Sequence, residues 1–341
     1  MEQLAPTGTC ESKLFVPFPI RCSVAQNLTL SNYPVTLMIR FLHRLVSIRS
    51  DASIQPGGLG PDEERYVLAR AYVPEHIVSL MTLISKGMPF LVEDHLGYLK
   101  DNWLILVGYP LEEPFTPERC QKILDRVLET YGPEYLWFIG PEVPASLQGS
   151  CRARQTDEYL ILDLEATRPS SSLRRVARKA AEQLAVESGH AFTREHQALV
   201  AEFKKRQSLP PMVEGLYDAM PDYLAHSASA CLLNAWDGQG NLSAFYVVEL
   251  AAEAFDTYIL GCYSRRNYVP HASDLLFYHM LELARERGKR TINLGLGVNE
   301  GIRRFKQKWG GVPFLKYEFC EAHYGPPEAL SLIDTFLEGK L

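Results

Sequence analysis

The chain has 341 residues, of which 46% are apolar and 22% are charged. This balance excludes disorder as the overall state, and the length suggests two domains at ~100–200 residues each. Lysines and arginines number 35 against 41 aspartates and glutamates, which gives a formal charge of −6. Proteins that bind nucleic acids or anionic membranes through their overall charge are usually basic, so an anionic partner would have to meet a local basic patch.

Neither a membrane span nor a metal framework is indicated. The longest apolar segments, such as residues 242–250, are strand-sized and fall short of the ~18 residues that a membrane span needs. The N-terminus lacks a basic start followed by an apolar run, so no signal peptide is predicted, and we expect a cytoplasmic protein. The seven cysteines are scattered without a Cys-x-x-Cys pair, which predicts free structural thiols.

Two features precede the first clear structural unit. Apolar residues recur at helical spacing over residues 35–48, which predicts a helix there. Residues 50–62 contain three glycines between two prolines, a composition that does not hold a regular element, so we predict a loop. We therefore expect residues 1–60 to form a partly helical N-terminal extension.

The first clear unit ends near residue 140. An apolar strand at residues 103–109 is followed by Thr116, a good N-cap, with proline at the first helical position. A helix with one apolar face then extends to Gly132, and residues 135–139 form a second apolar strand. A strand, a helix and a strand in this order favour a crossover between parallel strands.

The second half ends with the same layout. A strand at 257–263 is followed by a helix from Ser273, as N-cap, to Gly288 and by a strand at 291–294. The earlier elements are predicted as a strand at 159–164, helices at 173–188 and 198–206, an irregular segment at 209–221, and strands at 231–236 and 242–250. We therefore expect an α/β fold with mixed sheets, built as two similar domains at residues 61–157 and 158–341.

Residues 159–311 carry features that resemble a known family. They include a strand ending in Leu-Asp-Leu at 162–164, a basic helix at 173–180, a three-strand meander and a strand running into Asn293. The most specific feature is the closing Gly-x-x-x-Phe-Lys segment at 301–306. This part resembles the Fem-type aminoacyl transferases and their acetyltransferase-like relatives, which are built from two GNAT-type acyltransferase domains. The first half resembles them only through its layout, and the resemblance implies two GNAT-like domains, each a central mixed sheet flanked by helices.

The resemblance implies acyl transfer to an amine from a carrier, either acyl-CoA or aminoacyl-tRNA. The amine attacks the carbonyl directly, so the enzyme positions both reactants, removes a proton and stabilises an oxyanion without a metal or a covalent intermediate. In the family the lysine of the Phe-Lys pair lies near the transferred group, a role that falls here on Lys306, with Phe305 packing against the end of the carrier. Arg303 or Arg304 would attract phosphate. Neither a tightly bound cofactor nor a metal is expected.

One segment departs from the wider acetyltransferase pattern. Those enzymes hold the CoA pyrophosphate in a glycine-rich turn at a helix N-terminus, whereas residues 264–273 contain no glycine. Arg265 and Arg266 could meet phosphate through their side chains, and a solvated arginine pair is the alternative. The basic residues at 174–179 and 303–308 have the same two interpretations, phosphate contact or a solvated helix face.

The remaining candidate residues surround the expected cleft. Glu249, Asp256 and Glu300 could each accept the proton of the amine, although acids beside turns are commonly only solvating. Further candidates for contact with carrier or substrate lie near the ends of the last strands: Tyr263, Asn293 and Gly297. The nine histidines show no metal-ligand spacing, and no Gly-x-Ser-x-Gly elbow points to a hydrolase.

Three functions are open at this point. The first is a cytoplasmic, metal-free acyl or aminoacyl transferase with an amine acceptor and, for a charged donor, tRNA as partner. The second is a GNAT-like scaffold without activity that binds RNA or another phosphate-bearing ligand, which the glycine-free turn suggests. The third is a CoA-dependent N-acetyltransferase that works from the first domain. We expect neither DNA nor a membrane span to be involved.

Overall fold

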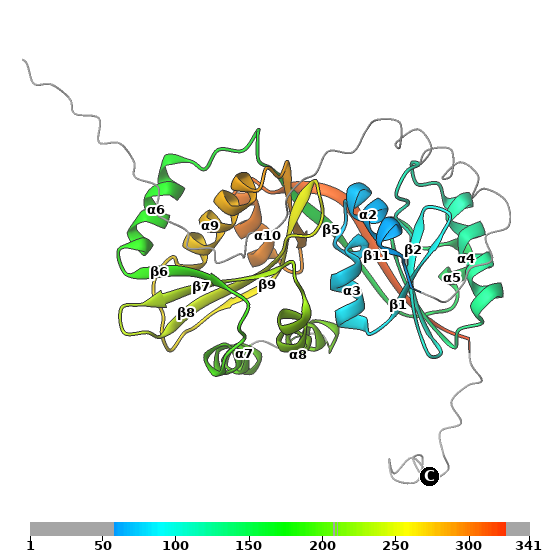
Figure 1. The fold of residues 1–341 in the computed structure, drawn as a ribbon, viewed down its shortest axis with the longest axis horizontal. Coiled ribbons are helices and arrows are strands. Elements are labelled where there is room, and N and C mark those ends of the chain that lie inside the picture. The colour runs from blue at the N-terminus through cyan, green and yellow to red at the C-terminus, as the bar shows by residue number, and fades with distance from the viewer. Residues whose placement is uncertain (1–57, 207–208, 210, 325–341) are drawn as a thin grey trace, which may run out of the picture.

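The structure, a computed structural model, describes residues 58–206, 209 and 211–324. The helix expected at 35–48 and most of the loop expected at 50–62 lie outside the described residues. A sheet of 11 strands runs through the described chain in the order β1-β2-β3-β4-β11-β5-β10-β9-β8-β7-β6, with helices on both faces (Figure 1).

The helices are α2 Pro61–Arg70, the 3₁₀ helix η1 Pro74–His76, α3 Val78–Ser85, α4 Pro117–Tyr131, α5 Ala145–Gln148, α6 Ser171–Ala181, α7 Arg194–Arg206, α8 Pro211–His226, α9 Ala272–Glu286 and α10 Glu300–Lys308. The strands are β1 Met88–Val92, β2 His95–Lys100, β3 Trp103–Val107, β4 Tyr135–Gly140, β5 Cys151–Asp163, β6 Leu184–Gly189, β7 Ala230–Asp237, β8 Leu242–Glu249, β9 Phe255–Tyr263, β10 Thr291–Leu296 and β11 Val312–His323.

The predicted strand–helix–strand unit of the first half is confirmed. Strands β3 and β4 are parallel, and α4 makes the crossover between them. Thr116 caps α4 by accepting a hydrogen bond from the backbone N–H of Arg119 (3.3 Å). Gly132 ends the helix in the left-handed conformation at φ +52°, where a side chain would be strained.

The second half repeats this unit, as the sequence predicts. Strands β9 and β10 are parallel, with α9 as the crossover. On one side of each parallel pair the sheet continues with antiparallel strands. On the other side one long antiparallel strand pairs with it: β11 with β4, and β5 with β10. The long strands β5 and β11 also pair with each other, which joins the halves into one sheet. The expected α/β fold with mixed strand pairing is therefore confirmed.

Three predicted elements are wrong in part. The helix expected at 173–188 ends at Ala181, and Leu184 starts a strand at the sheet edge, because the apolar residues after 181 satisfy the alternation of β6 paired with β7. The segment expected to be irregular at 209–221 belongs mostly to α8, which contains Pro221. Burial of the face around Tyr223 outweighs the hydrogen bond that the proline removes. Helix α9 has His271 rather than Ser273 as its N-cap.

The expectation that all cysteines are free thiols is also wrong. Cys151 on β5 and Cys320 on β11 form a disulfide across 169 residues of sequence. Their side chains meet because β5 and β11 are antiparallel neighbours, a pairing that no local pattern reveals. Cys120 and Cys262 are buried thiols.

Alternation along β5 separates two cores near the middle of the sheet. Leu160 points into a core formed with α6, α9 and α10, whereas Tyr159 points to the opposite face, into a core formed with α2 and α3. Figure 1 shows α9 and α10 close together near the upper end of β5, and α2 and α3 beside the middle of the sheet. Within the described ranges, no helix has the length and apolar character needed to cross a bilayer.

Candidate functional site

Strands β9 and β10 lose their hydrogen bonds part-way along. Their parallel pairing begins at Phe255 and Thr291 and stops at Thr257 and Asn293, although both strands continue. Gly295, at φ +71°, bends β10 just beyond this point. The parallel pair of the first half behaves differently, because it is bonded along the whole of β3. Beyond Thr257 and Asn293, in the second half, these two parallel strands are therefore not hydrogen-bonded to each other, and we call this interval between β9 and β10 the opening.

Lys306 reaches into this opening. Its Nζ donates a hydrogen bond to the carbonyl of Leu296 on β10 (2.6 Å) and lies 5.6 Å from the ring centroid of Tyr258 on β9. The residue is 5% exposed, so a solvated helix face does not describe Lys306. Burial lowers its pKa to about 7, and although the charge of Asp157 opposes this shift, that of Arg303 adds to it.

Contacts at both ends of helix α10 order the helix that carries Lys306. Asn299 caps its start by accepting from the backbone N–H of Ile302 (2.9 Å). At its end, the ring of Trp309 stacks on Phe277 of α9 (4.9 Å between centroids), and the indole Nε1 donates to Asp274 (3.0 Å). The cap orders the start of the lysine's helix, and the Trp309 contacts fix its end to α9.

Phe305, Arg303 and Arg304 make contacts within the protein, and the roles that the resemblance implies for them stay predictions. The Phe305 ring is partly exposed and packs against Phe277 at the edge of the core (5.6 Å between centroids), so it supports the helix. Arg303 forms ion pairs with Asp157 and Glu158, which already neutralise it. Arg304 is exposed and pairs with Glu300 four residues earlier.

Asn293 and Gly297 border the opening. Asn293 is fully buried; its Oδ1 accepts from the N–H of Gly295 (2.8 Å), and its Nδ2 donates to the carbonyl of Tyr72 (3.4 Å). A Cβ on Gly297 would lie 2.3 Å from a guanidinium nitrogen of Arg303, so a side chain here would displace that guanidinium. The structure thus brings Lys306, Asn293, Gly297 and Arg303 together.

Three other sequence candidates lie elsewhere. Glu249 is fully buried, and its carboxylate accepts from the Tyr223 hydroxyl and from two backbone N–H groups, so its oxygens are already occupied. Tyr263 is the last residue of β9, five residues beyond the Tyr258 ring that Lys306 approaches, and Arg206 and Arg265 lie 5.0 and 5.8 Å from its ring centroid. Asp256 is buried at the start of β9, and burial raises its pKa to about 6 against the opposing charge of Lys289.

The glycine-free segment between β9 and α9 is fastened from within the chain. Glu202 accepts from the Ser264 hydroxyl (2.9 Å) and from the backbone N–H of Arg265 (2.6 Å). The first turn of α9 carries Asp274, which is bonded to the end of α10. A phosphate at this place would therefore have to be met by side chains such as those of Arg265 and Arg266.

Sequence reasoning missed Glu75. It belongs to η1, and its Oε2 accepts a hydrogen bond from the Tyr159 hydroxyl of β5 (2.7 Å). Burial raises the pKa of Glu75, while the bond from Tyr159 lowers it in part. Nothing in the neighbouring sequence signals this position, because the contact joins residues that are 84 apart.

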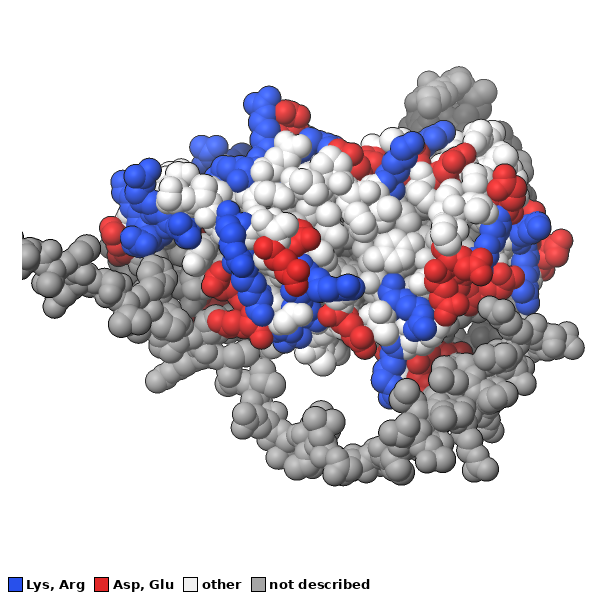
Figure 2. Space-filling model, turned by 90° about the horizontal axis from the view of Figure 1, so that it is seen from above, with Lys and Arg blue, Asp and Glu red and all other residues white. Residues whose placement is uncertain are grey.

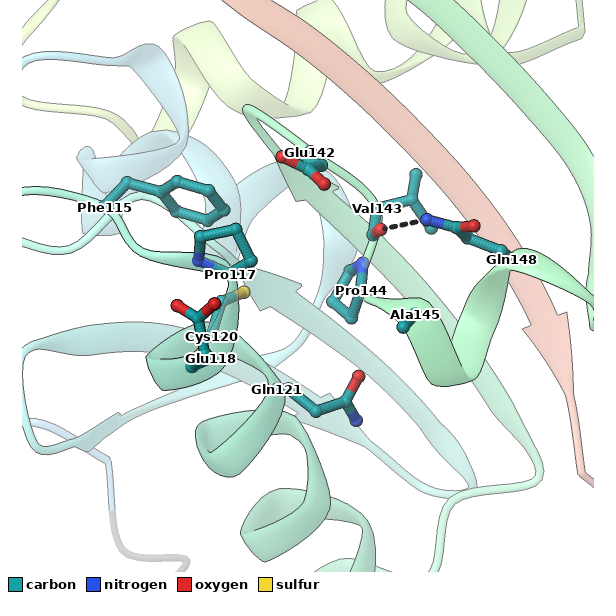
Figure 3. A pocket seen from close by; sticks show the side chains of 10 residues that line it. All are labelled: Phe115, Pro117, Glu118, Cys120, Gln121, Glu142, Val143, Pro144, Ala145 and Gln148. Carbon is teal, nitrogen blue, oxygen red and sulfur yellow. Dashed lines mark hydrogen bonds between the residues drawn. The ribbon is translucent and has the colours of Figure 1, made fainter.

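A second concave site lies in the first half (Figure 3). It is a cavity of about 260 Å³ between the start of α4 and the segment that leads from β4 into α5. Phe115, Pro117 and Pro144 supply apolar walls, and the charged groups among the lining residues are the carboxylates of Glu118 and Glu142. Its electrostatics favour a neutral or cationic occupant over an anionic one.

No family model matches the chain, and no curated protein matches it. Several solved structures are similar to it. L-PGS from Bacillus licheniformis is 17% identical, with 84% of this chain and 97% of that chain covered and a TM-score of 0.51. FemX is 12% identical, with 76% and 96% covered and a TM-score of 0.52. A tandem GNAT protein from the clavulanic acid biosynthesis pathway is 14% identical, with 80% and 98% covered and a TM-score of 0.50.

The chain has a GNAT-type, Fem-like fold. The two repeated strand–helix–strand units agree with the tandem arrangement that one of these neighbours is named for. At such low identity the likeness shows the fold, and the chemistry has to be argued from this chain's own residues. The resemblance noted for residues 159–311 is confirmed at the level of the fold.

Proposed function

We propose that the protein transfers an acyl or aminoacyl group from acyl-CoA or aminoacyl-tRNA to an amine. The observation that carries this proposal is the buried Lys306 in the opening between β9 and β10. A lysine is rarely buried without an acidic partner in contact, and strongly shifted groups concentrate at functional sites. The GNAT-type fold supports the same class of reaction.

The geometry suits stabilisation of an oxyanion. One N–H of the Lys306 ammonium is used by the Leu296 carbonyl, which leaves two for a carbonyl oxygen that enters the opening. When the amine attacks, negative charge develops on that oxygen, and a cation in a site of low dielectric stabilises the charge more than it would in water. Phe305 and Asn293 keep the lysine and the edge of the opening in place.

We propose that the carrier binds in the second half. Exposed Arg174, Arg175, Arg178 and Lys179 lie along α6, and Figure 2 shows blue side chains gathered at that end of the molecule. Such a surface attracts the phosphates of CoA or tRNA. In the first half the parallel strands stay bonded, and the carboxylates of its cavity would repel phosphate, which favours the second half as the working site.

Both carriers occur in the cytoplasm, so we place the protein there, and the Cys151–Cys320 pair is then expected to be reduced in the cell.

The test offers the purified protein acetyl-CoA, longer acyl-CoAs and charged tRNA together with an amine. We expect one donor to be consumed and the Lys306→Met variant to lose at least ~100-fold in kcat/KM, the effect of removing one oxyanion contact. Lys122→Met, which changes an exposed lysine of α4, is the matched control and should keep full activity. Equal activity of the Lys306→Met variant and the wild type would reject the role of Lys306.

A GNAT-like scaffold that binds a phosphate-bearing ligand without turnover is the second candidate. It is favoured by the segment after β9, whose backbone N–H at Arg265 is already bonded to Glu202. Retention on tRNA that weakens steeply with salt, with no donor consumed, would support it over the transferase.

A further inference from the structure

One peptide group connects the candidate site to strand β5. The carbonyl between Leu296 and Gly297 accepts the hydrogen bond from the Lys306 Nζ (2.6 Å). The N–H of the same peptide group, that of Gly297, donates to Oδ1 of Asp157 and to the carbonyl of Glu158 on β5 (3.2 Å each). Lys306 and β5 therefore hold opposite edges of one peptide plane, and the direction of its carbonyl sets where the ammonium lies.

The Asp157 carboxylate also fixes the corner that follows this peptide group. Its Oδ2 accepts from the backbone N–H of Val298 (2.8 Å), and its Oδ1 accepts from the backbone N–H of Glu158 (2.8 Å) and from Arg303 (3.0 Å). Val298 has φ +60°, a left-handed conformation that a β-branched side chain disfavours. Because the Val298 side chain is exposed, the backbone contact with Asp157 rather than side-chain packing holds this conformation.

Asp157 acts on Lys306 through its charge as well. Among the described residues, the ionisable groups that face the ammonium come from three elements: Tyr258 from β9, Asp157 from β5 and Arg303 from α10. Burial lowers the pKa of Lys306 to about 7, the negative charge of Asp157 raises it, and the positive charge of Arg303 lowers it. Burial raises the pKa of Tyr258, so this phenol is neutral. Asp157 therefore favours the ammonium form that a developing oxyanion requires.

We propose that Asp157 is a positioning residue: it orients the Leu296–Gly297 peptide group, and through that carbonyl it holds the Lys306 ammonium in the opening between β9 and β10. The inference rests on the proposed function and adds a residue that acts through Lys306 rather than on the reacting groups. Without this carboxylate the corner at Val298 leaves its left-handed conformation, and the carbonyl that directs the ammonium turns with it. A displacement of ~1 Å in such a contact is enough to cost ~100-fold in rate.

The first experiment compares Asp157→Asn with Arg303→Gln, because each removes one partner of the same ion pair (3.0 Å). Protein labelled with ¹³C at the lysine Cε atoms is titrated by NMR, and the signal missing from Lys306→Met identifies Lys306. We expect the pKa of Lys306 to fall in Asp157→Asn, which loses an anion, and to rise in Arg303→Gln, which loses a cation. A pKa that moves in the same direction in both variants, as loss of a merely structural ion pair would cause, would overturn the inference.

The second readout is transfer activity. Asp157→Asn should lower kcat ~10–100-fold and change the KM for the donor less than ~3-fold, because the contact with the oxyanion forms in the transition state. Asp163→Asn is the matched control. Asp163 lies on the same strand and also accepts from two backbone N–H groups of the turn that follows it, those of Glu165 (2.8 Å) and Ala166 (2.9 Å). This control should keep both the activity and the Lys306 pKa of the wild type.

Asp157→Glu separates orientation from charge and replaces the asparagine variant if that variant does not fold. It keeps the anion but moves the carboxylate by one methylene, so kcat should fall ~10-fold or more while the Lys306 pKa stays close to that of the wild type. Wild-type kcat in Asp157→Glu would overturn the inference.

The inference and the proposed function fail in different ways. If the wild type transfers acyl groups and Asp157→Asn changes neither kcat nor the Lys306 pKa, the inference fails and the proposed function stands. If the wild type consumes no donor, the proposed function fails, and the NMR titrations still decide whether Asp157 controls the charge of Lys306.

Discussion

Replacing Lys306 by methionine is expected to stabilise the protein while it removes acyl transfer. The pKa of this lysine falls from its ordinary 10.5 to about 7 because it is buried, which corresponds to about 5 kcal/mol of destabilisation at pH 7 and below. Methionine has a similar length and no charge, but it leaves the Leu296 carbonyl without its hydrogen bond, a loss of about 1–3 kcal/mol. The net gain is about 2–4 kcal/mol.

The extra free energy of unfolding of the Lys306→Met variant should decrease as the pH rises. Between pH 7 and 10.5 the unfolded wild type binds a proton at Lys306 that the folded wild type has released, so the stability of the wild type rises with pH in this window. The methionine variant lacks this group. The difference in free energy of unfolding is therefore largest at pH 7 or below and shrinks as the pH approaches 10.

Urea unfolding at pH 7 and at pH 9.5 measures this difference. The exposed lysine of Lys122→Met has no burial to relieve and provides the matched control. A Lys306→Met variant that is less stable than the wild type at pH 7, or a difference that does not change with pH, would refute the reasoning that the site holds a strained ammonium.

Three further predictions concern other parts of the molecule. Burial raises the pKa of Asp256 to about 6, so its charged form destabilises the fold as the pH rises from about 4 through 6. In urea unfolding, Asp256→Asn should increase the free energy of unfolding by about 1–3 kcal/mol at pH 7.5 and by little at pH 4. A Cβ on Gly108 would lie 2.4 Å from the buried ring of Phe138, so Gly108→Ala should lower the free energy of unfolding by about 1–3 kcal/mol, as measured by thermal unfolding. The folded variant should keep the wild-type transfer rate, and a lower rate would contradict an active site in the second half. Reduction of the Cys151–Cys320 disulfide should lower the free energy of unfolding by about 2–4 kcal/mol, and an unfolding midpoint that dithiothreitol does not change would show that the bond is absent or without effect.

Local signals predicted the parts of the fold that local interactions determine. Thr116 and Gly132 mark the ends of α4 because capping and left-handed backbone depend on the residue itself. The helix expected to continue to residue 188 is wrong because Leu184 starts a strand whose apolar residues also fit a helical period. Pro221 led to an irregular assignment because its effect on a helix is local, whereas the burial that maintains α8 is tertiary.

The candidate site was predictable only in outline. The Phe-Lys pair pointed to Lys306, but a run of basic residues gives no sign of which one is buried, since that depends on how α10 packs against α9. The disulfide and the Glu75–Tyr159 contact depend on pairings across 169 and 84 residues, which a single sequence does not reveal.

The position at which the reacting carbonyl binds decides whether Lys306 stabilises the oxyanion. A crystal structure of the protein with a non-hydrolysable acyl-CoA or aminoacyl-adenosine analogue would locate it. We predict that the carbonyl oxygen lies within about 2.7–3.2 Å of the Lys306 Nζ, between β9 and β10. An analogue bound in the cavity beside α4, with Lys306 still enclosed and out of contact with it, would contradict the account.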